Sequence, residues 1–283
     1  MSRVLDGKVV AQHMKADMIE RINQLKMRGI TPKMLIIRVG EREDDLSYEK
    51  GILKNCKSLG IEAEVATLPA NTSEASLKAV LTAANTDEAI HGIMLFRPLP
   101  SQINQEEIIN LIHSGKDVDC MSPDNLVHVF EGGSKSFVPC TAQAAVEVLK
   151  FYEVPLQGAK VAVVGRSLVV GKPLAMLLLD ENSTVQICHS KTKDMAKVTS
   201  EADVVIAAVG KAKFMDAGYF RTDAVVIDVG INVDESGRIC GDVDFEAVAD
   251  HVQAITPAVG GVGAVTTTVL LNNVVLACER MNP

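Results

Sequence analysis

The chain alternates short runs of valine and isoleucine with segments whose apolar residues recur at helical spacing. The clearest runs are AKVAVVG at residues 159–165, ADVVIAAVG at 202–210 and AVVIDVGIN at 224–232. Continuous apolar runs of this length are typical of strands that are buried on both faces of a parallel sheet. The alternation therefore predicts an α/β fold in which helices cover a mostly parallel sheet.

The order of these segments indicates two domains with a cleft between them. The first half carries expected helices over residues 7–27 and 44–59 and the strand MLIIRVG at 34–40. After Pro139, a helix over 140–152 leads into four Val/Ile-rich strands, which is typical of a doubly wound, Rossmann-like nucleotide-binding domain. We predict an N-terminal α/β domain over residues 1–138, completed by a helix over 266–283, and a Rossmann-like domain over 139–265.

Charge and cysteine content bound the possible partners and the compartment. The chain has 28 basic and 36 acidic residues, a net charge of −8 and no basic block, so we expect no nucleic-acid partner. Six widely spaced cysteines without a CxxC pair favour reduced thiols in the cytoplasm. Residues 252–278 are uncharged, but Pro257, several glycines, a Thr run and Asn272-Asn273 are expected to interrupt them, so we expect no membrane span.

The stretch VAVVGRSLVVGKP at residues 161–173 joins an apolar strand to a helix. It carries Gly165, Arg166, Ser167 and Gly171, and so differs from the usual GxGxxG fingerprint of dinucleotide-binding turns. Its context is still suitable, because the N–H groups at a helix N-terminus can hold a pyrophosphate.

The next predicted strand ends in His189-Ser190-Lys191. An NAD site would usually place an acidic residue there to bond the ribose 2′-hydroxyl. Arg166 and Lys191 could instead neutralise a 2′-phosphate, which favours NADP over NAD. Taken singly, each of these two cations is more commonly an ordinary surface charge, but both follow the carboxyl ends of strands, where such sheets bind ligands.

Several stretches taken together resemble one family. They are VVGRSLVVGKP, CHSKT at residues 188–192, VIDVGIN at 226–232, GDVDF at 241–245, ITPAVGGVG at 255–263 and KDVD at 116–119. In this order and spacing they are similar to the methylenetetrahydrofolate dehydrogenase/cyclohydrolase family, the bacterial bifunctional folate enzymes. The resemblance covers nearly the whole chain.

The resemblance implies a catalytic, folate-binding N-terminal domain, an NADP-binding domain and a homodimer. It implies oxidation of 5,10-methylenetetrahydrofolate to the 5,10-methenyl form and hydrolysis to 10-formyltetrahydrofolate, in one-carbon metabolism, tetrahydrofolate interconversion and purine biosynthesis. Tyr48 and Asp119 match the catalytic, folate-binding positions, and a carboxylate suits the adjacent donors of a pterin. By position, the NADP contacts are Gly165, Arg166, Ser167, Ser190 and Ile231, and the glycine loop beside the folate is Gly260, Gly261 and Gly263.

Two positions depart from the family pattern. The family lysine of the cyclohydrolase step follows the tyrosine by four residues, and here that position is Ile52. The family glutamine beside it is replaced by Phe96. Because a helix turns about 100° per residue, Lys50 and Lys54 are expected on the face opposite Tyr48, where neither can substitute.

These departures affect the two reactions unequally. Hydride transfer needs alignment of two carbons and no protein acid or base, whereas hydrolysis needs an activated water and proton transfers. We therefore expect an NADP-dependent dehydrogenase with weak or absent cyclohydrolase activity and no metal. One alternative is the full bifunctional enzyme, in which Arg97 compensates, although a permanently charged guanidinium is a poor proton shuttle. A second alternative is a non-catalytic folate or nucleotide-binding protein.

Overall fold

The computed structural model describes residues 3–133 and 137–283, which form two compact units. The three-stranded unit comprises the described residues within Met14–His128, Ser134–Val138 and Leu270–Pro283. The six-stranded unit comprises those within Met1–His13, Val129–Gly133 and Pro139–Val269. Three helices contribute residues to both units: α1 (Gly7–Met27), α5 (Pro123–Glu131) and α10 (Val262–Met281).

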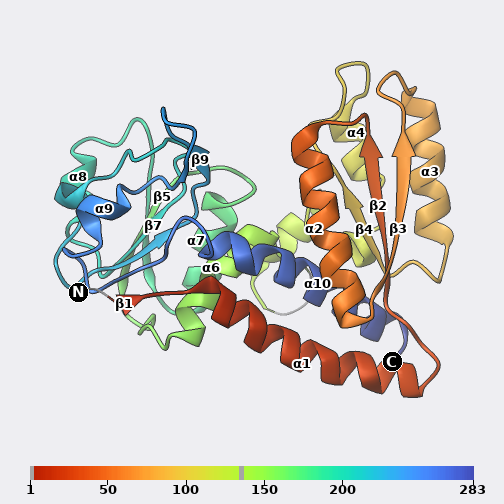
Figure 1. Cartoon of the computed structure of the whole chain (residues 1–283), viewed down its shortest axis with the longest axis horizontal. Coiled ribbons are helices and arrows are strands. Elements are labelled where there is room, and N and C mark those ends of the chain that lie inside the picture. The colour runs from red at the N-terminus through yellow and green to blue at the C-terminus, as the bar shows by residue number, and fades with distance from the viewer. Residues whose placement is uncertain (1–2, 134–136) are drawn as a thin grey trace. The chain divides into compact units, whose positions relative to one another are not determined.

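The three-stranded unit is a parallel sheet with the strand order β3-β2-β4. In Figure 1, α2 lies on one side of these strands and α3 on the other. The elements that belong to this unit alone are β2 (Lys33–Val39), α2 (Glu43–Leu59), β3 (Glu62–Leu68), α3 (Glu74–Thr86), β4 (Gly92–Leu95), α4 (Gln105–Asn110) and the 3₁₀ turn η1 (Ser114–Lys116).

Alternation along β2 explains why both faces of this sheet are covered. Leu35 and Ile37 point to one face, where they join a core with α3 and α4. Met34 points to the other face, where its sulfur lies 3.7 Å from the thiol of Cys56 on α2. Helix α2 ends where Gly60 adopts a φ of 77°, a left-handed conformation that glycine accepts without strain.

The six-stranded unit contains a second, larger parallel sheet. Its strand order is β1-β11-β8-β7-β5-β6, and a separate antiparallel ribbon pairs β9 with β10. Its elements are β1 (Arg3–Val4), α6 (Cys140–Phe151), β5 (Lys160–Val164), α7 (Gly171–Asp180), β6 (Thr184–Cys188), α8 (Met195–Thr199), β7 (Val204–Ala207), the 3₁₀ turn η2 (Ala217–Tyr219), β8 (Val225–Asp228), β9 (Asn232–Val233), β10 (Ile239–Cys240), α9 (Phe245–Val248) and β11 (Ala254–Ile255).

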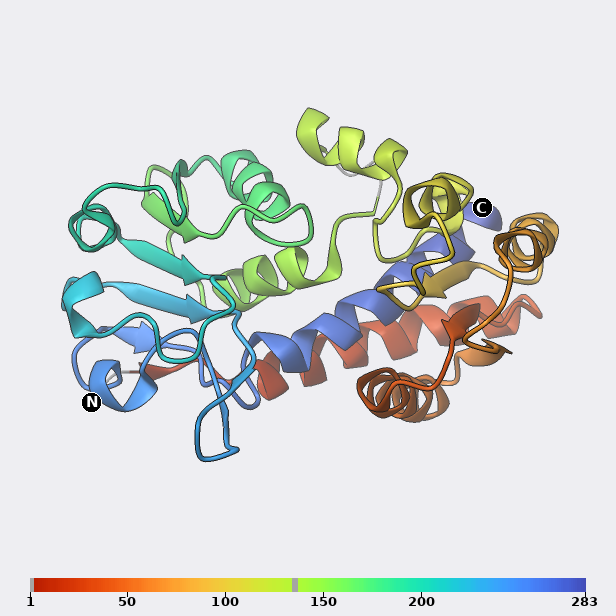
Figure 2. The ribbon, with the colours of Figure 1, turned by 90° about the horizontal axis from the view of Figure 1, so that it is seen from above.

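Helices cover both faces of this larger sheet. Ala162, Val205 and Val226 on three neighbouring strands pack with Val248 of α9 in one core. The opposite face is covered by α7, which contacts β5 and β6, and by α6, which packs on α7; both are green in Figure 2. The predicted α/β class with a doubly wound, Rossmann-like domain is therefore confirmed. The sequence does not predict β1 and β11, because strands of two residues leave no periodic signal.

Helix α10 differs from its expected form. It begins at Val262, four residues before the expected start, and it includes the Thr run and Asn272-Asn273, as the expected helix over 266–283 does. Asn273 is tolerated inside it because its amide donates a 2.8 Å hydrogen bond to the carbonyl of Val118. By length and composition α10 could cross a membrane, but more than half of it is buried, as is typical of a core helix.

Candidate active site

The corner between α2 and the end of β4 is apolar. The rings of Tyr48 and Phe96 lie 5.9 Å apart at an angle of 50°. Ile52, one helical turn beyond Tyr48, is 0% exposed, and Phe96 is 5% exposed. Lys50 and Lys54 are exposed to solvent, as predicted. No α2 lysine therefore faces this corner, and the two substituted positions belong to the core.

The KDVD segment beside this corner is held by its own first two side chains. The buried ammonium of Lys116 donates to the carbonyls of Ala84 and Asp87 at the end of α3, at 3.0 and 2.7 Å. Burial lowers the pKa of Lys116. Asp117 is 0% exposed, and its carboxylate accepts three hydrogen bonds, from the backbone N–H groups of Met121 and Ser122 and from the side-chain amide of Asn125. This anchoring fixes the turn that presents Asp119.

Asp119 itself is half-buried, and a cation lies beside it. Val118 packs against Gly92 of β4, where a Cβ atom would come within 2.8 Å of the valine side chain. This close packing, together with a parallel bridge between Asp117 and Ile93, sets the KDVD segment alongside β4. The guanidinium Nη2 of Arg97 lies 4.0 Å from Asp119 Oδ2, and the two side chains are 28% and 22% exposed. The sequence did not predict this pair, because it depends on how two separate segments meet.

A second lysine that the sequence did not point to approaches α2 from α1. Lys15 donates a 2.5 Å hydrogen bond to the side-chain oxygen of Asn55. Partial burial, and then the nearby charge of Lys54, lower the pKa of Lys15. Asn55 lies seven residues beyond Tyr48, which is about 10 Å along the helix. This amine is therefore displaced from the Tyr48–Phe96 corner.

In the six-stranded unit, close backbone contacts build the turn between β5 and α7. Gly165 has a φ of 151°, and a Cβ atom on it would collide with the carbonyl oxygen of Ala208. A Cβ atom on Gly171 would in turn collide with the carbonyl of Gly165. Arg166 and Ser167 are exposed between them, and the Ser167 hydroxyl accepts from Val170 N–H at 3.1 Å. The result is a compact turn leading into the N-terminus of α7, which suits a phosphate group.

A second turn follows β6 and meets the first. The N–H of Gly165 donates to the carbonyl of Cys188 at 2.9 Å, which joins the two strand ends. The N–H of His189 donates to the hydroxyl of Thr192 at 2.9 Å, and this closes the turn that carries Ser190 and Lys191. The structure therefore brings Gly165 and the Ser190 turn together, with no carboxylate in either turn.

Two buried carboxylates connect the loops after β7 and β8. Asp242 is 0% exposed and accepts four hydrogen bonds, from the N–H groups of Val209, Gly210 and Lys211 and from the amide of Asn232. Asp228 accepts from the N–H groups of Gly230, Asp242 and Val243. Burial, and then Asp242 nearby, raise the pKa of Asp228 to about 6, against the opposing effect of these N–H donors.

The predicted glycine loop packs against other backbone of the same unit. Gly260 has a φ of 85°, and its carbonyl accepts from the N–H of Gly7 at 2.8 Å. A Cβ atom on Gly261 would collide with the carbonyl of Pro257, and one on Gly263 would lie 3.1 Å from Ile231. Ile231 and Gly263 are thus neighbours, and Ile231 is 64% exposed. Backbone conformation and internal packing therefore account for glycine at 260 and 261, whereas at 263 a Cβ atom would meet only the end of the Ile231 side chain.

Known proteins match both halves of the chain. Residues 5–119 match the family model described as "Tetrahydrofolate dehydrogenase/cyclohydrolase, catalytic domain", and residues 139–282 match the NAD(P)-binding domain of the same family. The "Bifunctional protein FolD 1" of Desulfitobacterium hafniense is 51% identical over 279 residues, covering 99% of both chains. The crystal structure of the bifunctional FolD enzyme of Campylobacter jejuni matches with a TM-score of 0.96 at 37% identity, covering 99% of both chains. The Trypanosoma brucei FolD, solved with NADP and an inhibitor, has a TM-score of 0.92 at 33% identity, covering 99% of this chain and 98% of the other.

The chain belongs to the tetrahydrofolate dehydrogenase/cyclohydrolase family. Membership confirms the predicted family, the enzyme class and the presence of an NAD(P)-binding domain. The individual roles assigned to Tyr48, Asp119, the cofactor turns and the glycine loop stay predictions.

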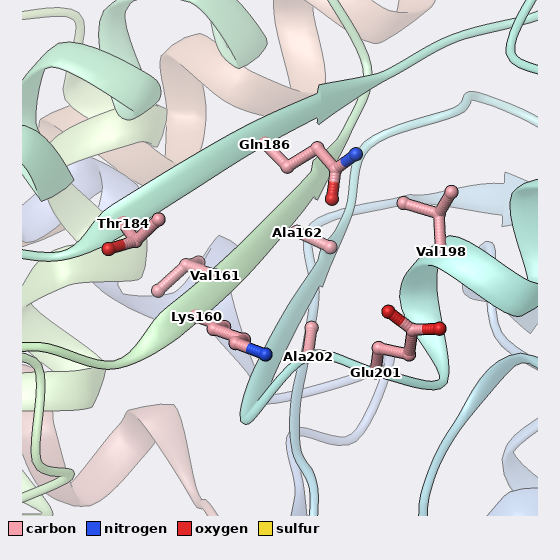
Figure 3. A pocket seen from close by; sticks show the side chains of 8 residues that line it. All are labelled: Lys160, Val161, Ala162, Thr184, Gln186, Val198, Glu201 and Ala202. Atoms are coloured by element: carbon pink, nitrogen blue, oxygen red, sulfur yellow. The ribbon is translucent and has the colours of Figure 1, made fainter.

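One pocket of the six-stranded unit lies away from the turns that follow β5 and β6, the predicted cofactor site. It has a volume of about 210 Å³ and is lined by the residues labelled in Figure 3, among them Lys160, Thr184 and Glu201. Lys160 and Thr184 are the first residues of β5 and β6, whereas Gly165 and Ser190 follow the ends of these strands. In doubly wound sheets, ligands bind at the carboxyl ends of strands, so this pocket does not mark the cofactor site.

None of the six cysteines is joined in a disulfide, and all six are buried. Within residues 3–133 and 137–283, no group of three or more His, Cys, Asp or Glu side chains is arranged to hold a metal. The prediction of a metal-free enzyme is not tested by that observation and stays a prediction.

Proposed function

We propose that this enzyme oxidises 5,10-methylenetetrahydrofolate to the 5,10-methenyl form with NADP, and that its cyclohydrolase activity is weak or absent. The observation that carries the proposal is the apolar corner at Tyr48, where Ile52 and Phe96 are core residues. A buried isoleucine and a buried phenylalanine can neither activate water nor transfer a proton, which hydrolysis requires. Hydride transfer needs only that two carbons be held in line.

The chain's residues supply binding and alignment in this proposal. Asp119 accepts the two adjacent donors of the pterin, and Tyr48 forms a wall of the folate pocket. The turn at Gly165, Arg166 and Ser167 binds the dinucleotide phosphates, because it leads into the N-terminus of α7, whose N–H groups can donate to a phosphate. Bound NADP supplies the hydride acceptor.

NADP is proposed over NAD from the two turns that Gly165 joins. Arg166 and Lys191 are exposed there, near the place where the 2′-phosphate would lie. Replacing Arg166 by Ala should raise KM for NADP about tenfold or more and leave KM for NAD nearly unchanged, because only NADP carries the 2′-phosphate. Equal losses with both cofactors would place Arg166 elsewhere on the dinucleotide.

The central test supplies methylenetetrahydrofolate with NADP or NAD and follows reduced cofactor and methenyl product separately. Accumulation of methenyl product in step with NADPH is the expected result. Enzymatic hydrolysis of added methenyltetrahydrofolate well above the uncatalysed rate would overturn the proposed loss of the second activity. Absence of NADPH would instead favour a binding protein.

A substitution pair tests the corner directly. The double variant Ile52→Lys/Phe96→Gln should gain methenyl hydrolysis, because it restores both polar groups at the family positions. Ile52→Met/Phe96→Leu is the matched control, since it disturbs the same core without adding an ionisable group. Burying a lysine here is destabilising and lowers its pKa, so both variants should be assayed below their measured Tm.

The full bifunctional enzyme is the second candidate, and the names of the curated relatives favour it. In that case a group other than an α2 lysine must act on water. Lys15 and Arg97 are the cations to test, although Lys15 is bonded to Asn55, two turns from Tyr48. Loss of a measured hydrolysis in Lys15→Met or Arg97→Leu would identify that group.

We also propose a cytoplasmic homodimer. Buried free thiols suit a reducing compartment. Exposed apolar side chains on and near the β9–β10 ribbon suit a protein interface, among them Val233, Ile239 and Val259, at 66%, 58% and 62% exposed. Sedimentation velocity should give about twice the chain mass, and Ile239→Asp should shift the distribution toward the monomer if this ribbon is the interface.

A further inference from the structure

We propose that Arg97 is a specificity-determining residue that recognises the 4-oxo group of the pterin beside Asp119. This inference rests on the proposed function, since it names how that site selects its substrate. Arg97 directly follows Phe96, one of the two positions that depart from the family pattern.

The separation of the two charges carries the assignment. Hydrogen-bonded ion pairs of this type are about 2.7–2.9 Å long, whereas Arg97 Nη2 and Asp119 Oδ2 are 4.0 Å apart. The carboxylate and the guanidinium therefore lie side by side without a direct hydrogen bond between these two atoms. A carboxylate has about four acceptor sites and a guanidinium five N–H donors, so both can also bond to a third group.

The pterin edge has a matching order of groups. Its 2-amino group and its ring N3–H are donors, and the adjacent 4-oxo oxygen is an acceptor. Asp119 can accept from the two donors, and an arginine next to it can donate to the oxygen. Asp119 as acceptor with Arg97 as donor is thus complementary to the whole pterin edge, from the 2-amino group to the 4-oxo oxygen.

The surroundings hold the two side chains in this order. Lys116 and Asp117 anchor the turn that carries Asp119. Phe96, directly before Arg97, is buried against the ring of Tyr48. Both charges are partly shielded from water, which strengthens a hydrogen bond to a ligand relative to an exposed pair.

Steady-state kinetics give the first measurement. Arg97→Leu should raise KM for methylenetetrahydrofolate about tenfold or more, with smaller changes in kcat and in KM for NADP. Arg97→Lys should recover part of the loss, because it restores one donor. Arg42→Leu is the matched control: Arg42 also lies 4.0 Å from a carboxylate, that of Asp45, but is 46% exposed, and its loss should change neither KM.

Ligand selectivity separates recognition from a merely structural role. Tetrahydrofolate and its 4-amino counterpart are compared as competitive ligands, because the 4-amino group presents donors to the guanidinium where the 4-oxo group accepts. The same change removes the N3–H that Asp119 accepts, so the share of the preference that Arg97 carries is the share lost in Arg97→Leu. Wild-type enzyme should prefer the 4-oxo ligand, and Arg97→Leu should reduce that preference about tenfold. Wild-type activity with unchanged selectivity in Arg97→Leu would overturn the assignment of Arg97 alone. Absence of tetrahydrofolate binding by the wild type would overturn the proposed function with it.

Discussion

Each unit of the molecule contains the tripeptide Asp-Val-Asp, and the two copies have the same burial pattern. In the three-stranded unit, Asp117 and Val118 are 0% exposed and Asp119 is half-buried. In the six-stranded unit, Asp242 and Val243 are 0% and 1% exposed and Asp244 is half-buried. In both copies the first aspartate organises the surrounding backbone.

The two copies differ in what the second aspartate faces. Asp119 lies beside Arg97 in the candidate folate site. Asp244 precedes the short helix α9, where its backbone carbonyl accepts from the N–H of Ala247 at 3.1 Å and its side chain makes no capping bond. The same motif is thus a scaffold in both units, whereas its second aspartate lies beside an arginine in the first copy and at the start of a short helix in the second.

The largest expected effect comes from removing the charge of the first aspartate in each copy. An asparagine at 242 must turn its amide nitrogen toward two N–H donors whichever way it is oriented, so Asp242→Asn should lower the free energy of unfolding by about 3–5 kcal/mol. An asparagine at 117 can be oriented so that its amide nitrogen faces only one N–H donor, that of Met121. Asp117→Asn should therefore lower the free energy of unfolding by only about 1–3 kcal/mol. Urea denaturation measures both.

The exposed Asp223→Asn is the control for these variants. Equal losses at 117 and 242 would contradict the count of hydrogen bonds as their cause. Amide hydrogen exchange should show faster exchange at residues 209–211 in one variant and at 121–122 in the other, since those N–H groups lose their acceptors.

Variants of the second aspartate in each tripeptide, Asp119 and Asp244, should differ in enzyme activity but not in stability. Asp119→Asn should lower kcat/KM for methylenetetrahydrofolate about 100-fold, because the carboxamide cannot accept from both pterin donors. Asp244→Asn should stay within about twofold, and both variants should keep a Tm close to the wild type. A comparable activity loss in Asp244→Asn would contradict the different roles given to the two second aspartates.

The residue before the first tripeptide, Lys116, makes a smaller contribution to stability. Lys116→Met should destabilise the chain by about 1–3 kcal/mol, because it removes a buried donor to two carbonyls at the end of α3. Lys78→Met on the surface of α3 is the control and should leave Tm almost unchanged. If both variants unfold like the wild type, the buried ammonium does not hold the KDVD turn.

The smallest effect is a pH dependence confined to the six-stranded unit. The pKa of Asp228 rises from its ordinary 3.8 to about 6 on folding, chiefly through burial. Between these values the unfolded chain binds fewer protons, so the stability that Asp228 contributes falls as pH rises from about 4 to 6 and is constant above. The stability difference between wild type and Asp228→Asn should fall by about 2 kcal/mol or less over that range. A difference that grows with pH would contradict the raised pKa.

How much the sequence predicted depends on whether the signal is local. Helical phase placed Lys50 and Lys54 on the exposed side of α2, and Val/Ile runs located β5, β7 and β8, because both signals lie within one segment. Family spacing pointed to Ile52, and the structure adds that this side chain is completely buried.

The remaining features depend on contacts between distant segments. The Arg97–Asp119 pair requires Val118 to pack on Gly92, and the Asp228–Asp242 scaffold joins loops from separate strands. Inside α10, Asn272 and Asn273 both find partners on other segments, in Arg21 and in the carbonyl of Val118. No local pattern encodes such partners, so sequence reasoning missed them.

The buried Ile52 and Phe96 also bear on the direction of the reaction. Hydrolysis is the step that would commit the one-carbon unit to the formyl level. In an enzyme whose corner excludes that step, the hydride transfer remains reversible, and its net direction follows the ratio of oxidised to reduced dinucleotide in the cell. With these two apolar side chains, the enzyme would interconvert methylene- and methenyltetrahydrofolate in either direction and so keep the two folate pools close to equilibrium.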